Sequence, residues 1–400
     1  MPVARGISEA MQAGSWIRRM FERGRELKAR LGPDAVFDLS LGNPLLEPPA
    51  AFREALAGIA AEPPAGWHRY MTNAGFPEVR EAIAAHLGRK GLLRTTGDHI
   101  VMCCGAGGGL NVALKALLDP GDEVIVLAPF FPEYHHYVAN HGGRGVAAQT
   151  DAAFLPDLAE IARHLTPRTK AILLNSPNNP TGRVYPRALL ASLADLLDRH
   201  GRSSGRPVTV LSDEPYREIV YGDGGIAPSM ASLYPHTIQV YSWSKSLSVP
   251  GERIGYIAVN PETHEARSLV DGLIFSTRVL GFINAPATMQ RVAARLLDVS
   301  VDVAPYRAKR DRVVAALQAA GYDLVAPEAA FYVFPKSPIP DDVAFCEKAL
   351  EEMVLVVPGS GFGRAGHFRL AYCTDDRTID EGLKRLARVA EKLRGIQGRA

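Results

Sequence analysis

The sequence lacks several features that would assign its class at once. No apolar segment reaches the roughly 18 uninterrupted residues that a membrane-spanning helix needs, and no internal repeat is evident. The 45 Lys and Arg residues nearly balance the 43 Asp and Glu residues, so that the formal net charge is only +2. This balance gives no electrostatic footprint for a polyanion. We therefore expect neither a nucleic-acid partner nor a membrane-bound protein.

Cysteine is also scarce, with four residues in 400 and no C-x-x-C pair among them. Adjacent Cys103 and Cys104 are poorly placed to bridge each other, and Cys346 and Cys373 lie far along the chain. This usage is typical of reduced core thiols in a cytoplasmic protein. We expect no metal site.

Short strand-like runs alternate with helix-length stretches between about residues 50 and 260. The runs are almost continuously apolar, which indicates a mainly parallel sheet covered by helices on both faces. The last runs are separated by too few residues for a crossover helix, so one antiparallel strand is expected. The runs are HIVMCC, DEVIVLAP, TKAILLNSP, PVTVLSDEP, TIQVYSWS and RIGYIAVN.

The pattern changes near residue 285, where helical stretches are followed by short strands. The chain is thus predicted to be an α/β protein with a large sheet domain and a smaller α+β domain. We expect residues 1–47 to form an N-terminal arm and part of the small domain, residues 48–284 the large domain, and residues 285–400 the C-terminal small domain.

Four of the apolar runs end abruptly in polar or glycine-rich sequence. In an open parallel sheet the carboxyl ends of the strands share one edge, and ligands bind at that edge. The polar groups of four segments should therefore meet in one place: Cys103–Gly109, Asn175–Gly182, Ser212–Tyr216 and Ser242–Lys245.

The glycine-rich turn CGAGGGLN, which opens a helix, is a candidate phosphate site. Unpaired N–H groups and the helix dipole both attract an anion there, although an ordinary tight turn would also use glycine. Leu110 breaks the dinucleotide-binding fingerprint, and the G-K-[ST] of a Walker A loop is absent. Neither of those phosphate motifs therefore applies.

Charged residues follow two of the other runs. The carboxylate of Asp213 needs a partner at a buried strand end: a cationic ring nitrogen of a ligand, or else a helix cap or an ion pair. Lys245, if desolvated near other cations, becomes a nucleophilic amine rather than a snorkelling surface lysine. Arg253 offers a planar fork for phosphate or carboxylate. Together with the glycine-rich turn and a nearby asparagine, these groups indicate pyridoxal 5′-phosphate (PLP) bonded to Lys245.

With these residues, the sequence resembles the class I/II aminotransferases, which are PLP enzymes of fold type I in the aspartate aminotransferase superfamily. The resemblance covers nearly the whole chain. It implies a mostly parallel seven-stranded sheet sandwiched by helices in the large, PLP-binding domain, a homodimer with shared active sites, and ping-pong transfer of an amino group from an L-amino acid to a 2-oxo acid. The motifs that carry it are LSLGNP, RYMTNAGFPEVREAI, NSPNNPTG, SDEPY, SWSKSLSVPGERIGY and FRLAYC.

The resemblance also implies catalytic roles. Lys245 would form the internal aldimine and move a proton between the substrate Cα and the cofactor C4′. Asp213 would keep the pyridine nitrogen protonated, which makes the ring an electron sink. Tyr216 and Asn179 would hydrogen-bond the phenolic oxygen of the cofactor and tune the pKa of the aldimine.

Further roles in binding follow from the same resemblance. Phe131 matches the aromatic residue that stacks on the cofactor ring, with its register open against Phe130 or Tyr134, and a core phenylalanine is the alternative. Arg369, helped by the Gly42 backbone and by Asn179, would bind the α-carboxylate of the substrate. The cofactor phosphate would be held by Ser242, Arg253, the backbone amides of Ala106 and Gly107, and Tyr70 of the neighbouring subunit, and Ser244 is counted with the cofactor-binding residues.

Substrate specificity is the least determined feature. Some relatives place a lysine for the distal carboxylate in the glycine-rich turn, but that position here is Gly107. Others use an arginine of the partner subunit, for which Arg278 is the candidate, although its spacing is off by about one residue and a surface charge is the alternative. We expect aspartate-type or broad specificity.

Other functions remain open at this point. A PLP-dependent C–S β-lyase or another PLP lyase would share every cofactor-binding residue, because the choice of bond depends on how the substrate is oriented. A non-catalytic PLP-binding regulator would need a DNA-binding domain, for which we see no room ahead of FDLSLGNP. An NAD dehydrogenase is disfavoured by the broken fingerprint.

Overall fold

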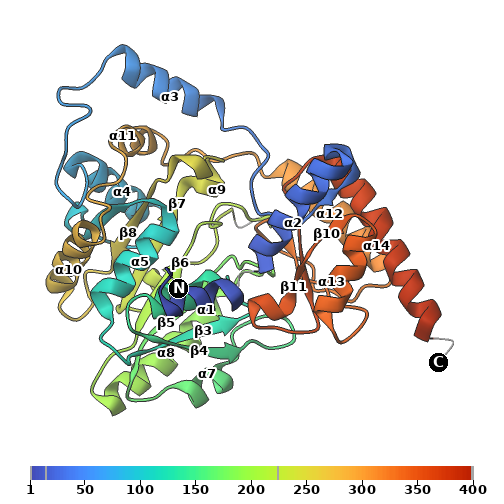
Figure 1. The fold of residues 1–400 in the computed structure, drawn as a ribbon. Helices are drawn as coiled ribbons and strands as arrows, with labels where there is room; N and C mark the ends of the chain where they lie inside the picture. Colours follow the sequence, from blue (N-terminus) through green and yellow to red (C-terminus); the bar gives the residue numbers. More distant parts are fainter. Residues whose placement is uncertain (1, 14–15, 223–224, 398–400) are drawn as a thin grey trace.

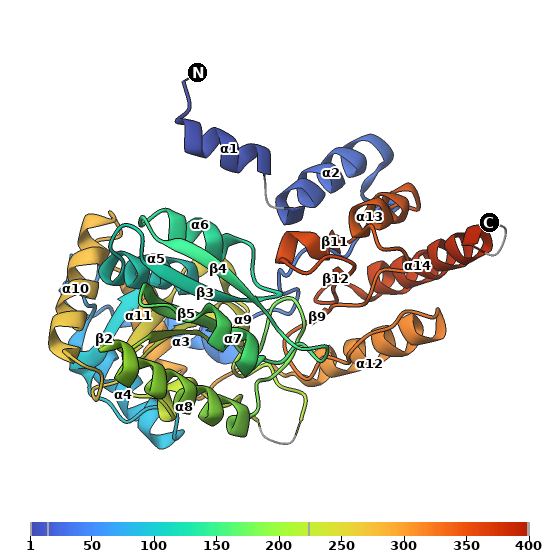
Figure 2. The same ribbon diagram turned by 90° about the horizontal axis from the view of Figure 1, so that it is seen from below.

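The computed structural model describes residues 2–13, 16–222 and 225–397. Two lobes lie side by side, one built around a large twisted sheet and the other around two small sheets with long helices (Figures 1 and 2). We call them the sheet lobe and the small lobe. No helix among the described residues is both long enough and apolar enough to pass through a bilayer.

The sheet lobe contains a seven-stranded sheet in the order β2-β8-β7-β6-β5-β3-β4. Its strands are β2 (Ile100–Cys103), β3 (Glu123–Ala128), β4 (Arg144–Gln149), β5 (Thr169–Asn175), β6 (Thr209–Asp213), β7 (Thr237–Ser242) and β8 (Gly255–Val259). All neighbours pair in parallel except β8, which runs antiparallel to both β2 and β7. The short link between β7 and β8 leaves no room for a crossover helix, so the expected antiparallel strand is confirmed.

Helices cover both faces of this sheet, which explains why its central strands are apolar throughout. Val124 and Val126 of β3 pack with α5 and α10, whereas Ile125 and Leu127 point to the opposite face and pack with α7 and α8. The helices of the sheet lobe are α3 (Ala50–Ala61), α4 (Pro77–Arg89), α5 (Gly105–Leu117), α6 (Glu133–Ala139), α7 (Leu158–His164), α8 (Arg187–Ser204), α9 (Trp243–Ser246), α10 (Ala266–Val279) and α11 (Ala287–Arg295).

The small lobe joins both ends of the chain, because β1 pairs in parallel with β10 and β12 lies between β11 and β9. Its strands are β1 (Phe37–Asp38), β9 (Tyr332–Val333), β10 (Val354–Leu355), β11 (Val357–Pro358) and β12 (Phe368–Ala371). Its helices are α2 (Trp16–Leu31), α12 (Ala304–Ala319), α13 (Asp342–Glu351) and α14 (Asp376–Gln397), and α1 (Arg5–Ala13) precedes them. Short 3₁₀ turns are η1 (Pro33–Ala35), η2 (Gly97–His99), η3 (Met230–Ser232), η4 (Pro250–Glu252) and η5 (Gly359–Phe362).

The domain boundaries remain a prediction. The packing of α11 favours a change to one of them, the boundary at residue 284. Met289 and Val292 of α11 belong to the same apolar cluster as Ile59 of α3 and Ile83 of α4. We propose that the large domain continues through α11 instead of ending at residue 284. The boundary near residue 47 needs no change, since β1 pairs with β10 of the small lobe.

Candidate active site

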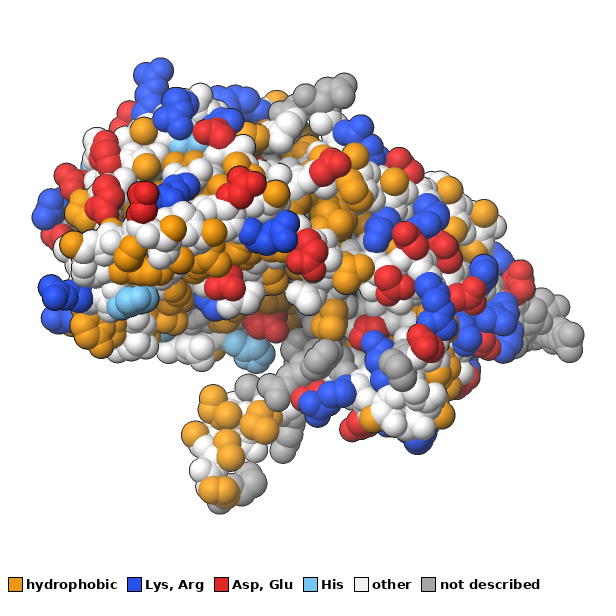
Figure 3. All heavy atoms as spheres, turned by 90° about the horizontal axis from the view of Figure 1, so that it is seen from above, with side chains coloured by type: hydrophobic (Ala, Val, Ile, Leu, Met, Phe, Trp, Pro, Cys, Tyr) orange, Lys and Arg blue, Asp and Glu red, His pale blue; other side chains and the backbone are white. Residues whose placement is uncertain are grey.

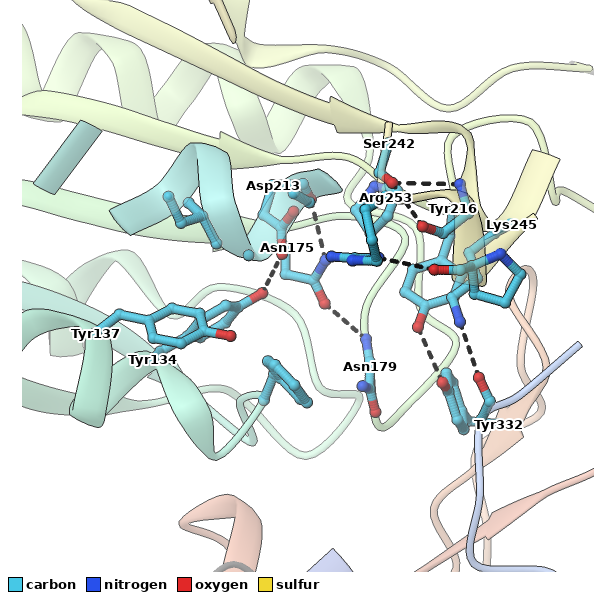
Figure 4. Close-up of a pocket in the computed structure, with 18 of the residues that line it drawn as sticks. Tyr134, Tyr137, Asn175, Asn179, Asp213, Tyr216, Ser242, Lys245, Arg253 and Tyr332 are labelled. Carbon is cyan, nitrogen blue, oxygen red and sulfur yellow. Dashed lines mark hydrogen bonds between the residues drawn. The ribbon is translucent and has the colours of Figure 1, made fainter. Parts of the chain in front are cut away.

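A cavity of about 330 Å³ lies where β5, β6 and β7 end, and residues of the small lobe close its other side (Figure 4). All four predicted polar segments contribute to its wall. Twelve of the predicted site residues line it: Gly42, Ala106, Gly107, Phe131, Asn179, Asp213, Tyr216, Ser242, Ser244, Lys245, Arg253 and Arg369.

The antiparallel direction of β8 explains how Arg253 reaches this edge. Gly255, the first residue of β8, lies opposite both Ser242 at the end of β7 and Cys103 at the end of β2. Residues just before β8 therefore meet residues just after the parallel strands. A parallel β8 would have placed Arg253 at the far edge of the sheet.

The glycine-rich turn, Ser242 and Arg253 together form an anion cup. Gly105 begins α5 with φ of +72°, and a side chain there would collide with the guanidinium of Arg253. Arg253 donates to the carbonyl oxygens of Cys104 (3.2 Å) and Pro250 (3.0 Å). The hydroxyl groups of Ser242 and Ser244 lie 2.7 Å apart. A helix N-terminus, a guanidinium and two hydroxyl groups suit a phosphate group.

Lys245 lies on the short helix α9, directly after β7, and its Nζ donates to the carbonyl oxygen of Gly42 at 2.8 Å. Desolvation, opposed by Cys373 and helped by the charges of Arg253 and Arg369, lowers the pKa of Lys245 to about 8. More of the amine is therefore neutral near physiological pH than in an ordinary lysine. A neutral amine is the form that attacks an aldehyde.

Asp213, at the end of β6, is a buried carboxylate whose two oxygens differ in their surroundings. Tyr134 Oη donates to Oδ2 at 2.5 Å, whereas the buried Oδ1 has no hydrogen-bond partner among the described residues. Burial raises the pKa of Asp213 to about 7, against the opposing effect of Tyr134. An unpartnered buried oxygen in a cavity wall suits a cationic ring nitrogen.

Arg369, on β12 of the small lobe, is fully buried and faces the cavity from the other side. Its Nη1 donates to Asn179 Oδ1 at 3.1 Å and its Nη2 donates to the carbonyl oxygen of Ser40. Its buried Nε has no partner in the part of the chain that the structure describes. The guanidinium lies over the ring of Tyr332, with its Cζ 4.8 Å from the centroid. This arrangement suits a carboxylate ligand.

The structure favours one of the three aromatic residues that could stack on the cofactor ring. Phe131 lines the cavity, while Phe130 packs on His135, with ring centroids 4.5 Å apart, and against Gly363. Tyr134 also lines the cavity, but its hydroxyl is bound to Asp213. Phe131 is the better candidate for stacking on a ring held by Asp213.

Two predicted residues lie outside the cavity. Tyr70, in the loop between α3 and α4, is 88% exposed. Arg278, in the last turn of α10, is also exposed, and its guanidinium lies 5.2 Å from the ring centroid of Phe275 on the same helix. Neither of them contributes to the cavity wall of its own chain.

Several residues of the wall were missed by sequence reasoning. Asn175 belongs to the motif NSPNNPTG, and it donates to the backbone oxygen of Asp213 and accepts from the backbone N–H of Asn179, so its place in that motif was a usable signal. Tyr332 reaches the wall from the small lobe, and its hydroxyl lies 2.9 Å from that of Tyr216. No local pattern marks Tyr332. The others missed are Leu110, Tyr137, Pro215 and Pro250, whereas Tyr134 was predicted only as an alternative stacking residue.

Comparisons with known proteins assign the chain to a family. Residues 34–386 match the family described as Aminotransferase class I and II. The chain belongs to this family. The family is PLP-dependent, so the protein is a transaminase that uses pyridoxal 5′-phosphate.

Its relatives resemble it over nearly their whole lengths. An aspartate/prephenate aminotransferase from Thermus thermophilus is 34% identical, with 96% of this chain and 99% of the relative covered. An aspartate aminotransferase from Thermotoga maritima is 32% identical over 95% and 96% of the two chains. These relatives do not favour the lyase or regulator alternatives.

Solved structures show the same fold. A crystal structure of an amino transferase from Eubacterium rectale has a TM-score of 0.93 at 35% identity, covering 98% of this chain and 99% of that chain. The aspartate aminotransferase from Thermus thermophilus with maleate has a TM-score of 0.86 at 32% identity, covering 97% and 100%. The expected fold type I architecture is thereby confirmed.

The residues of the cavity fit PLP. The unpartnered Oδ1 of Asp213 suits the ring nitrogen, the anion cup suits the phosphate, and the amine of Lys245 suits the aldehyde. Each of these groups lines the same cavity, so one ligand of that kind can meet all three.

Proposed function

We propose that this aminotransferase moves the amino group of an L-amino acid to a 2-oxo acid in two half-reactions, with aspartate-type or broad specificity. The observation that carries the proposal is the Lys245 amine, which lines one cavity together with the Asp213 carboxylate and the Arg369 guanidinium. A nucleophile, a partner for a ring nitrogen and a carboxylate-binding group are the parts that this reaction needs.

The proposed roles follow from the contacts. When bound, PLP supplies an aldehyde that takes up the amino group and a ring that withdraws the electron pair from the substrate Cα. Lys245 Nζ holds the cofactor and carries the proton away from the substrate Cα. Asp213 Oδ1 binds the ring nitrogen and stabilises its positive charge. Tyr216 and Asn179 bind the phenolic oxygen.

The remaining groups position the two molecules. Arg369 binds the α-carboxylate of the substrate, aided by Asn179, which already accepts a hydrogen bond from it, and by the Gly42 backbone. Phe131 stacks on the cofactor ring. The phosphate is held by Ser242, Ser244, Arg253 and the backbone amides of Ala106 and Gly107.

A second copy of the chain completes the site in this proposal. Tyr70, Phe275, Arg278, Val279 and Ile283 are exposed, and we call them the interface surface. The Tyr70 loop contacts the segment that follows α10, because the side chain of the nearby Asn73 donates to the backbone oxygen of Ile283 at 2.8 Å. Large exposed apolar residues next to a site mark a protein contact. We propose a homodimer in which Tyr70 reaches the phosphate of the neighbouring subunit.

Helix α1 gives further support for a contact with a second copy. It stands away from the rest of the molecule with apolar side chains outward (Figure 3). Ile7 and Met11 of this helix are 53% and 69% exposed. A helix with such a face is stable only when something covers it.

The location of the protein remains a proposal. The four cysteines are free in the structure, and Cys103, Cys346 and Cys373 are buried. Free, buried thiols are typical of a reducing compartment. We propose that the protein is cytoplasmic.

The reaction is tested by single-turnover spectra of the PLP-loaded protein with a panel of amino acids. We expect a suitable donor alone to convert the yellow cofactor to its pyridoxamine form, and a 2-oxo acid to restore the yellow form. Release of ammonia and pyruvate without any 2-oxo acid would instead indicate a β-lyase. A protein that binds PLP but converts no amino acid would contradict the proposed function.

Arg278 is proposed to recognise a distal carboxylate from across the interface. The described cations that line the cavity are Lys245, Arg253 and Arg369, and each already has a role. Arg278→Ala should lower kcat/KM for aspartate and glutamate by about 10- to 100-fold, because a hydrogen bond to a charged group is lost. Alanine and aromatic donors should be nearly unaffected.

The matched control for this test is Arg267→Ala, which removes an exposed arginine from the same helix. It should leave the kcat/KM of every donor unchanged. Equal losses for all donors in Arg278→Ala would remove Arg278 from specificity.

A further inference from the structure

Tyr134 has no role in the proposed function, although it lies in the wall of the cavity (Figure 4). Its side chain is buried on α6, and its hydroxyl donates to Asp213 Oδ2 at 2.5 Å. The two residues are far apart in sequence, so the contact depends on the placement of α6 beside the end of β6. A buried hydrogen bond of this kind is strong because its acceptor is charged.

This hydrogen bond makes the two oxygens of Asp213 unequal. Oδ2 accepts a hydrogen bond from Tyr134, whereas Oδ1 is buried and no described residue binds it. In addition, the side-chain amide of Asn175 donates to the backbone oxygen of Asp213 at 3.0 Å. The backbone and one oxygen are thus both held, which leaves Oδ1 as the atom that is free to bind a ligand.

We propose that Tyr134 is a positioning residue that orients the Asp213 carboxylate, so that Oδ1 binds the ring nitrogen of PLP. This inference rests on the proposed function, in which Asp213 is the partner of that nitrogen. Tyr134 acts through Asp213 and needs no contact with the substrate.

Among the described residues, the other acidic groups that interact with Asp213 are Cys103 on β2, Tyr137 on α6, and Glu214 and Tyr216 just after β6. The cations Lys245, Arg253 and Arg369 line the same cavity, and Tyr134 donates a hydrogen bond to the carboxylate itself. Glu214 raises the pKa of Asp213, as does burial, whereas the hydrogen bond from Tyr134 lowers it. Without that hydroxyl the neutral acid would be favoured, and a neutral acid stabilises a cationic ring nitrogen less well.

The same short segment also carries the stacking candidate. Phe131 and Tyr134 are three residues apart, and their rings meet edge to face with centroids 5.5 Å apart. The segment after β3 therefore positions both Phe131, which is proposed to stack on the cofactor ring, and the hydroxyl of Tyr134, which is proposed to orient the Asp213 carboxylate. A shift of this segment would disturb both contacts at once.

The test uses the full-length chain and measures the dissociation constant of PLP from the apoenzyme. Tyr134→Phe is expected to weaken binding by about 10- to 100-fold, which corresponds to one lost hydrogen bond to a charged group. The pH below which the variant loses its affinity for PLP should also be higher than in the wild type, because Asp213 becomes easier to protonate.

The matched control is Tyr234→Phe. Tyr234 is equally buried, but its hydroxyl donates to the backbone oxygen of Val208 at 3.0 Å, away from the cavity. Loss of this hydroxyl should lower stability only, with the PLP affinity and its pH dependence unchanged. A Tyr134→Phe protein that behaves in the same way would overturn the inference.

Two further measurements separate an effect on the orientation of the Asp213 carboxylate from a general loss of structure in the Tyr134→Phe protein. The penalty of Tyr134→Phe should disappear for a PLP analogue in which carbon replaces the ring nitrogen, and also in an Asp213→Asn background. An undiminished penalty in either case would contradict the inference. A wild-type enzyme that does not transaminate would refute the proposed function, whereas an active wild type with normal PLP binding by Tyr134→Phe would refute the inference alone.

Discussion

Lys245→Ala is expected to abolish transamination, lowering turnover by at least about 10⁴-fold, because it removes both the nucleophile and the proton carrier. The amine lies in the cavity with a pKa lowered to about 8, and no other lysine lines the described wall. The measurement is steady-state amino transfer together with the absorbance of the covalently held cofactor. Both signals should be lost, while the fold is retained.

Two variants separate the possible roles of the lysine. Lys245→Arg keeps the positive charge without a nucleophilic amine, so it should be as inactive as the alanine variant. Lys170→Ala removes another half-buried lysine, on β5, whose pKa is also lowered by burial. It should retain activity. Substantial transamination by Lys245→Ala would refute the central assignment.

Asp213→Asn is expected to lower turnover by at least about 100-fold, because an uncharged amide stabilises the ring nitrogen of the cofactor less well than a carboxylate does. The replacement has nearly the same shape and can still accept the hydrogen bond from Tyr134. The loss should therefore appear in kcat more than in KM. Turnover within a few-fold of wild type would show that Asp213 does not carry this charge.

Although Asp213→Asn should lower turnover, it should raise the stability of the apoenzyme at neutral to alkaline pH. The pKa of Asp213 is about 7 in the folded protein, above the ordinary 3.8, so the folded state favours the protonated acid. Its contribution to stability is full below about pH 4 and is lost as the pH rises through about 7. Asp213→Asn should thus raise the urea midpoint of the apoenzyme near pH 8 and change it little near pH 4.

As its control, Asp122→Asn changes a buried aspartate that is paired with Arg206, away from the cavity. This change should lower the stability of the apoenzyme, because it weakens an ion pair, and it should not affect turnover. Destabilisation of the apoenzyme near pH 8 by Asp213→Asn would contradict this prediction, because it would show that the ionised carboxylate stabilises the fold.

Much of the fold could be predicted from local patterns, since each strand and helix leaves a periodic signal. The nearly continuous apolar runs predict a sheet buried on both faces, because a residue on either face of such a strand packs against a helix. The short link between β7 and β8 predicts the antiparallel strand. The shared edge follows from the parallel strands, because all their carboxyl ends point the same way.

The order of residues along the chain is thus enough to predict the sheet, its polar edge and the chemical groups on it, from Asp213 and Lys245 to Arg253. The packing of whole elements sets which groups share a hydrogen bond across elements, such as Tyr134 with Asp213 or Arg369 with Asn179. It also brought Tyr332 into the wall and left Tyr70 and Arg278 outside it. The reason is physical: local periodicity reports which face of an element is buried, whereas a contact between distant side chains depends on how whole elements pack.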